Sequence, residues 1–81
     1  MNVVDRGEKM FIDPDISIPP NMPKLLLEDL KLLQKYYDDD DWLHYDLLFD
    51  AVEGSIKSYH LCGKISRADA VQLFHRYGIM I

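Results

Sequence analysis

Cysteine, glycine and long apolar stretches are all scarce in this chain of 81 residues. Its single cysteine, Cys62, has no partner for an intramolecular disulfide, so the fold must rest on an apolar core. The four glycines are dispersed and do not form the glycine-rich loop that binds phosphate groups. No uncharged stretch approaches the roughly 18 residues that span a bilayer, and the N-terminus lacks the basic and then apolar layout of a signal peptide. We therefore expect a cytoplasmic protein without a membrane segment.

The side chains that carry out catalysis or bind metal ions form only incomplete sets. Neither the serines nor the cysteine lie in the glycine-flanked turn that exposes a catalytic nucleophile. His60 and Cys62 are two residues apart, so a helix would direct them to nearly opposite sides. Asp41 and His44 have a spacing found in carboxylate-bridged metal sites, but the other Glu and His residues of such a site are missing. We expect no enzymatic activity, no metal site and no cofactor.

Acidic side chains outnumber basic ones, with 14 Asp and Glu against 9 Lys and Arg, which gives a net charge of −5. A disordered acidic tail contains few apolar residues, whereas 48% of this chain is hydrophobic. We therefore expect one small folded domain. The negative charge opposes binding to phosphates, so direct nucleic-acid binding is not expected.

The spacing of the apolar residues predicts an all-α fold. Apolar side chains recur at the period of a helix over residues 24–37, 41–62 and 66–77. Helices joined by loops this short favour antiparallel neighbours. The sequence therefore predicts a compact three-helix bundle over residues 24–81.

Capping residues mark the ends of these helices. The run of aspartates over residues 38–41 fits a helix start, because Asp accepts hydrogen bonds from the unpaired N–H groups of a first turn. Ser66 fits the next N-cap, and Gly63 and Gly78 fit helix stops. Gly54 lies inside the second helix, where it costs up to about 1 kcal/mol relative to Ala. We interpret it as a sign of a close helix crossing.

All four prolines lie in residues 1–23, which we therefore predict to form an extended N-terminal arm. Apolar residues such as Phe11 and Ile16 give the arm enough surface to lie on the helices. Residues 10–12 have the composition of a short strand.

One carboxylate, Asp29, interrupts the apolar side of the first helix. A carboxylate in this position needs a partner, such as a tyrosine hydroxyl or a basic side chain, or else lies at a seam between two separate contacts. We favour the paired side chain and keep the seam as the alternative.

The clearest charge pattern lies in the middle of the chain, where residues 38–53 carry seven carboxylates and no Lys or Arg. Opposite charges speed encounter and select a partner, whereas apolar anchors provide affinity. The candidate anchors are Trp42, Leu43 and Leu47, because Leu43 and Leu47 project away from the expected buried side and Trp42 lies at its edge. The predicted partner-binding residues are Asp38, Asp39, Asp40, Asp41, Trp42, Leu43, Asp46, Leu47, Asp50 and Glu53. They predict a small accessory or regulatory interaction module, an inhibitor or adaptor that docks a basic nucleic-acid-handling protein.

Other interpretations of the same residues stay open. The carboxylates are also typical of a helix cap and a solvated helix face, and packing of the arm would bury Leu43 and Leu47. A homodimer is a further expectation, because the arm and the C-terminal tail are apolar. A DNA-binding regulator of the helix-turn-helix kind is the main alternative function. Its exposed third-helix residues would be Arg67, Gln72, His75 and Arg76.

About half of the chain resembles short uncharacterised helical proteins carried by mobile genetic elements of anaerobic gut bacteria. The resemblance lies in Asp40-Asp41-Trp42, Tyr45-Asp46, Phe49, Glu53, Lys57-x-Tyr59, Gly63-Lys64-Ile65-Ser66 and Phe74-x-x-Tyr77-Gly78. It implies a bacterial cytosolic protein with an accessory role, and it implies neither a catalytic site nor a substrate. Proteins of mobile elements include inhibitors that imitate nucleic acid, and the run of four aspartates is compatible with such a role.

Overall fold

The computed structural model describes residues 10–80, which form three α-helices. Helix α2 covers Lys24–Asp38, α3 covers Trp42–Leu61 and α4 covers Arg67–Arg76. This arrangement confirms the predicted all-α three-helix fold, and each helix end lies within one residue of its predicted position. Residues 10–12 do not form a strand, so that prediction is wrong.

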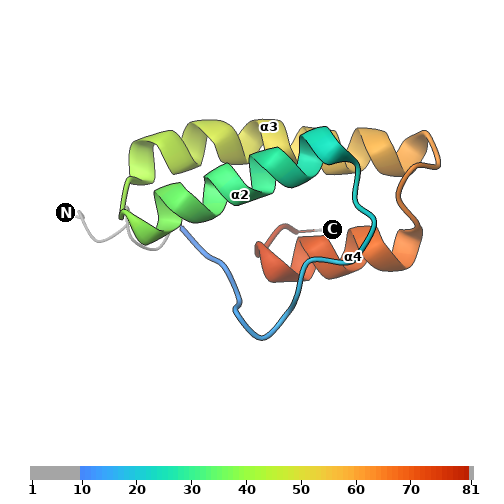
Figure 1. Cartoon of the computed structure of the whole chain (residues 1–81), viewed down its shortest axis with the longest axis horizontal. Coiled ribbons are helices and arrows are strands. Elements are labelled where there is room, and N and C mark those ends of the chain that lie inside the picture. Colours follow the sequence, from blue (N-terminus) through green and yellow to red (C-terminus); the bar gives the residue numbers. More distant parts are fainter. Residues whose placement is uncertain (1–9, 81) are drawn as a thin grey trace.

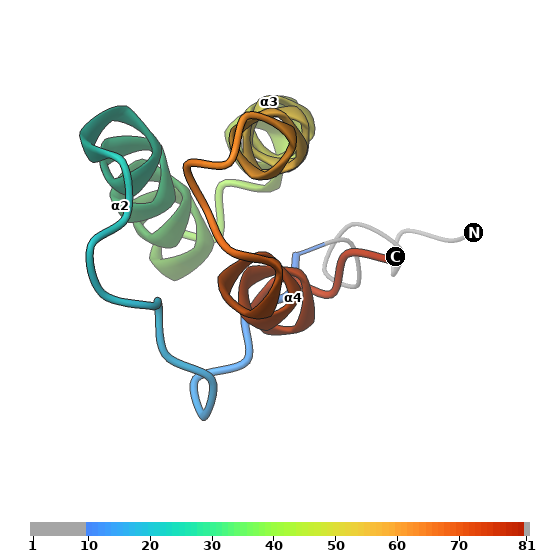
Figure 2. The ribbon, with the colours of Figure 1, turned by 90° about the vertical axis from the view of Figure 1, so that its right-hand side faces the viewer.

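The two longer helices, α2 and α3, run antiparallel as neighbours, and α4 lies along one side of this pair (Figure 1). The view along the helices shows the three axes at the corners of a triangle (Figure 2). Apolar residues from all three helices, the α3–α4 loop, the arm and the tail form one core. Its buried members are Ile12, Leu26, Leu30, Leu33, Tyr45, Val52, Ile56, Ile65, Ala70, Leu73, Phe74, Tyr77 and Ile79.

Local capping explains why the helices begin and end where they do. The Asp41 side chain accepts a hydrogen bond from the His44 N–H, and the Ser66 side chain accepts one from the Asp69 N–H. Gly63 and Gly78 follow α3 and α4 with φ of 80° and 66°. Glycine adopts this left-handed conformation without the steric cost that a Cβ atom adds. The predicted cap at Ser66 and the stops at Gly63 and Gly78 are therefore confirmed, whereas of the aspartate run only Asp41 caps α3, because Asp38 is the last residue of α2.

Two expectations about single residues are wrong. A Cβ atom added to Gly54 would meet nothing within 4 Å, so no close helix crossing within the described chain explains this glycine. Asp29 is half-buried, and within residues 10–80 it has neither a hydrogen bond nor an ion pair. The alternative of a carboxylate at a seam therefore fits Asp29 better than the paired side chain.

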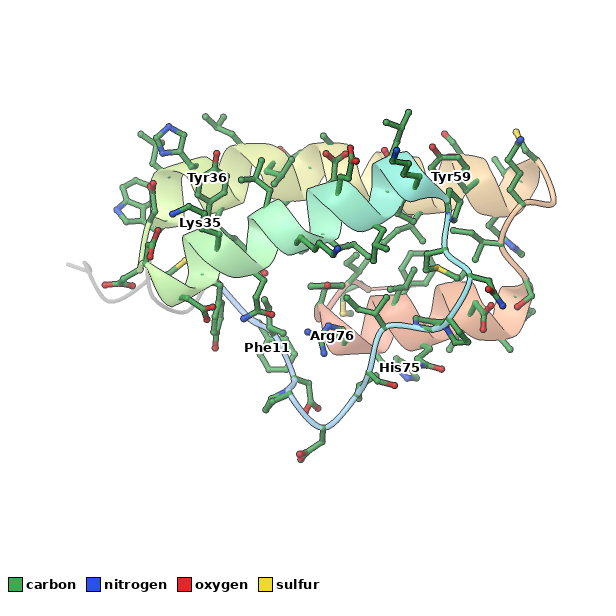
Figure 3. The ribbon with its side chains drawn as sticks, in the orientation of Figure 1. Phe11, Lys35, Tyr36, Tyr59, His75 and Arg76 are labelled. Carbon is green, nitrogen blue, oxygen red and sulfur yellow. The ribbon has the colours of Figure 1, made fainter. Side chains whose placement is uncertain are left out.

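The described part of the arm, residues 10–23, runs irregularly and is attached to α4. The Asp13 N–H donates to the Arg76 carbonyl oxygen at 2.8 Å, and the Gln72 amide donates to the Ser17 carbonyl oxygen at 2.7 Å. The Arg76 guanidinium also donates to the Ile16 carbonyl oxygen, and it lies beside this part of the arm (Figure 3). The other predicted arm residues, 1–9, lie outside the described residues.

Of the apolar tail, Ile79 is buried in the core and Met80 is exposed. Ile81 lies outside the described residues.

Candidate protein-interaction surface

The aspartate run forms the turn between α2 and α3, where local contacts hold most of its carboxylates. Asp38 accepts a hydrogen bond from the Gln34 amide at 3.0 Å, and the Lys35 Nζ lies 2.8 Å from Asp39 Oδ2. Asp40 has a positive φ of 58° and is exposed. These contacts join exposed side chains, so each contributes little to stability and is readily exchanged for a contact with a partner.

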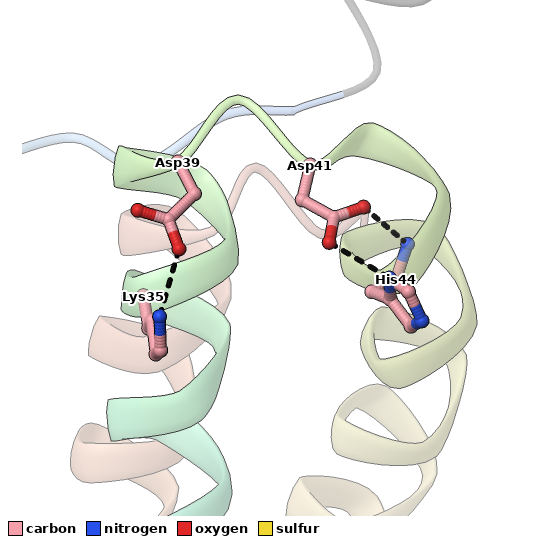
Figure 4. Close-up of polar contacts among 4 residues, drawn as sticks. All are labelled: Lys35, Asp39, Asp41 and His44. Atoms are coloured by element: carbon pink, nitrogen blue, oxygen red, sulfur yellow. Dashed lines mark hydrogen bonds and ion pairs between the residues drawn. The ribbon is translucent and has the colours of Figure 1, made fainter.

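Asp41 is the most constrained of the four, because it caps α3 and also contacts the His44 ring (Figure 4). The Oδ2 of Asp41 lies 2.7 Å from the His44 Nδ1, and the His44 ring stacks on Tyr36 with 5.2 Å between the ring centres. Desolvation acts to raise the pKa of the Asp41 carboxyl, but the hydrogen bonds from the His44 side chain and backbone outweigh it and lower the pKa. Asp41 is therefore a structural cap that stays ionised at neutral pH, and it is the member of the run least available to a partner.

On α3 the carboxylates of Asp46, Asp50 and Glu53 follow one another along the helix, because spacings of four and three residues return to nearly the same side. Asp50 is exposed, and Asp46 and Glu53 are half-buried. Glu53 pairs with Lys57 at 2.8 Å, whereas Asp46 and Asp50 form no ion pair within residues 10–80. Two of the three carboxylates are therefore available to a basic side chain of a partner.

Apolar side chains are exposed next to these carboxylates. Leu43 is 50% exposed and Leu47 is 65% exposed, whereas Trp42 is half-buried. The described part of the arm runs along α4 and does not cover the two leucines. The structure thus brings together Leu43, Leu47, Asp46 and Asp50 as one accessible patch on α3, with Trp42 at its edge.

The side of α4 that the DNA-binding alternative would use is partly occupied. Gln72 and Arg76, two of its four residues, donate hydrogen bonds to backbone carbonyl groups of the arm. Arg76 also donates to the Gln34 side chain at 3.2 Å. Only Arg67 and His75 of this set are exposed. A nucleic acid would therefore have to displace the arm before it could contact all four side chains.

Of the residues considered for metal binding, only Asp41 and His44 are in contact, at 2.7 Å. His60 Nδ1 lies 3.3 Å from the Ile65 carbonyl oxygen, and Cys62 is exposed at the end of α3. Across residues 10–80, no three side chains of His, Cys, Asp or Glu come close enough together to hold a metal ion.

Two further exposed leucines, which are not among the predicted anchors, lie on α2. Leu25 is 68% exposed and Leu32 is 39% exposed. The helical period places both leucines beside the main apolar row of α2. Whether side chains at the margin of a broad apolar surface are buried depends on which other helices pack against them. The three-dimensional arrangement was needed to separate the two outcomes.

No helix within the described residues is both long enough and apolar enough to cross a membrane. Comparisons with models of protein families, with curated proteins and with solved structures find no match to this chain.

Proposed function

We propose that this chain is a non-enzymatic interaction module that docks a basic protein on the acidic surface of α3, as an inhibitor or adaptor. The observation that carries this proposal is the exposure of Leu43 and Leu47 directly beside Asp46 and Asp50. A solvated helix face usually presents single apolar side chains, whereas here two leucines one helical turn apart are exposed among carboxylates.

The two kinds of side chain have different roles in the proposed complex. The leucines provide affinity, because their burial against a partner removes apolar surface from water. The carboxylates provide attraction and selection, since residues 38–53 contain no Lys or Arg that would weaken their field. A nucleic-acid-handling protein has the required chemistry, because its phosphate-binding surface is basic.

Capture on the immobilised chain from nuclease-treated bacterial lysate tests this function. The double variant Leu43→Ser with Leu47→Ser should retain at least about tenfold less of each specific partner, because two apolar anchors are lost. Leu61→Ser is the matched control, since Leu61 is 85% exposed on the same helix but lies at its other end. If the double variant and this control retain the same proteins in the same amounts, the leucines are not anchors and the proposal fails.

The contribution of charge is tested separately. Asp46→Asn with Asp50→Asn should slow association and reduce its dependence on salt, whereas Glu28→Gln, which neutralises an exposed carboxylate on α2, should change neither. Direct binding of the wild-type chain to duplex DNA, lost in Arg67→Ala, would favour the DNA-binding regulator instead. Arg67 is the suitable position for this test, because replacing Arg76 would also release the arm.

A further inference from the structure

The α2–α3 pair has an outer face, which we define as the side of the pair opposite α4. Figures 1 and 2 show α4 on one side of the pair, and no other described segment lies over the opposite side. At about 100° per residue, Leu25 and Leu32 lie across α2 from Gln34, the residue that contacts Arg76 of α4. The exposed leucines of α2 therefore belong to the outer face.

The outer face also includes part of α3. Leu47 lies across α3 from the fully buried Ile56, at about 100° per residue, and it is 65% exposed. Both helices of the pair thus present leucines on a face that no described element covers. Apolar side chains gathered in this way are typical of an interaction site.

The two helices differ in charge along this face, because basic side chains outnumber acidic ones beside the leucines of α2 and a carboxylate lies on α3. Beside its leucines, α2 presents three exposed basic residues, Lys24, Lys31 and Lys35, and one exposed acidic residue, Glu28. Beside Leu47, α3 presents the exposed Asp50, three residues further along the helix. A helix with the leucines and lysines of α2 has the chemistry that the acidic surface of α3 requires in a partner.

We propose that a second copy of this chain is such a partner, and that two copies pack outer face against outer face. The twofold axis runs parallel to the helices, so α2 of each copy lies antiparallel on α3 of the other. Four antiparallel helices then surround one additional apolar layer. This inference rests on the proposed function, because it uses the same acidic surface and identifies α2 as a segment that binds it.

The register within one chain fixes the contacts between two copies. Tyr36 stacks on His44, so these two residues are level across the antiparallel pair. Counting along both helices from this pair brings Lys31 level with Asp50 to within one residue. An axis parallel to the helices preserves these levels, so Lys31 of one copy lies beside Asp50 of the other, and the symmetry repeats this contact.

The outer side of α3 has room for the incoming leucines. Ala51 and Gly54 are small and exposed, and a Cβ atom at Gly54 would meet nothing within 4 Å. Large side chains pack well against small ones on a facing helix, since each fills the space that the other leaves. No crossing within the described chain explains the glycine at position 54. A crossing between two copies would explain it.

Asp29 sets a limit on the strength of this assembly. It lies between the buried leucines of α2 and the exposed ones, on the edge that faces α3. In the dimer the two Asp29 carboxylates approach the axis, where they lose water and repel each other. We therefore expect a weak dimer that Asp29→Asn strengthens about threefold or more.

Sedimentation equilibrium of the full chain at concentrations up to about 1 mM tests the inference. The wild type should form dimers, and Leu32→Asp or Leu47→Asp should raise the dissociation constant about tenfold or more, because each change acts twice in a symmetric dimer. Leu61→Asp is the control that should leave it unchanged, since Leu61 lies beyond the level of the first residue of α2. Circular dichroism verifies that each variant remains helical.

A charge exchange tests the register without touching the apolar residues. Lys31→Glu and Asp50→Lys should each weaken the dimer about tenfold, and the two changes together should restore it, because the exchanged charges attract again. Both side chains are exposed, so neither change disturbs the fold. A chain that stays monomeric throughout the concentration range, a dimer unaffected by Leu32→Asp, or a double exchange that does not restore association overturns the inference. Capture of a foreign protein that depends on Leu43 and Leu47 would in each case leave the proposed function standing.

Discussion

Replacing Tyr45 with phenylalanine tests how firmly the arm is attached to the helices. Tyr45 is buried, and its hydroxyl donates to the Phe11 carbonyl oxygen at 2.8 Å and accepts from the Phe11 N–H at 3.4 Å. A hydrogen bond contributes about 0.5–1.5 kcal/mol net of its exchange with water. Because Phe11 is 46% exposed, water can reach its backbone in the variant. We therefore expect the free energy of unfolding to fall by about 1 kcal/mol at neutral pH.

The same substitution changes the response to alkaline pH. Burial raises the pKa of Tyr45 to about 12, and the hydrogen bond from the Phe11 backbone only partly opposes this effect. In an unfolded chain the pKa of tyrosine is about 10, so the folded chain holds this proton more tightly. The stabilisation is complete below about pH 10 and is lost as the pH rises through about 12. Between about pH 10 and pH 12 the free energy of unfolding therefore falls by about 2–3 kcal/mol.

Urea unfolding followed by circular dichroism, at neutral pH and at steps up to about pH 11, measures both effects. The matched control is Tyr36→Phe, because the Tyr36 hydroxyl makes no hydrogen bond within residues 10–80. The wild type and this control should lose stability steeply in the alkaline range, and Tyr45→Phe should lose less. An alkaline slope for Tyr45→Phe equal to that of the wild type would refute the argument from burial.

Two further pairs of variants test the core and the backbone conformations. Leu30 is fully buried, whereas Leu32 is 39% exposed on the same helix. In urea unfolding, Leu30→Ala should therefore lower the free energy of unfolding by about 2–5 kcal/mol and Leu32→Ala by less than about 1 kcal/mol. Similar losses for the two variants would contradict the described core. Gly54→Ala should stabilise the dilute chain by up to about 1 kcal/mol, because the position is helical and open, whereas Gly63→Ala should destabilise it, because φ is +80° there. Thermal unfolding compares the two, and stabilisation by both changes would contradict the conformation given to Gly63.

Local chemistry in the sequence is sufficient to place the helices. The repeat of apolar residues at the period of a helix depends only on neighbours along the chain, and so do the caps at Asp41 and Ser66 and the stops at Gly63 and Gly78. The exposure of Leu43 and Leu47 is equally foreseeable, since both project away from the buried side of a helix whose repeat is clear. The role of these leucines in binding stays a prediction.

Most of the expectations that proved wrong concern contacts between segments that are distant in the sequence. Asp29 was expected to pair with another side chain, and Gly54 was expected to lie at a close helix crossing. Neither contact is present within residues 10–80. Gln72 and Arg76 were placed on an exposed face of the last helix, but the arm lies against both. The apolar period of a helix depends only on its own sequence. It cannot show where the arm, more than fifty residues away along the chain, will pack.

The sequence by itself determined three amphipathic helices, their ends and the concentration of carboxylates between residues 38 and 53. Only the tertiary structure decided which part of each apolar surface is covered. The reason is geometric: α2 is apolar over a broad arc, and α4 lies on only one side of the α2–α3 pair, so Leu26 and Leu30 are buried while Leu25 and Leu32 stay exposed on the other side.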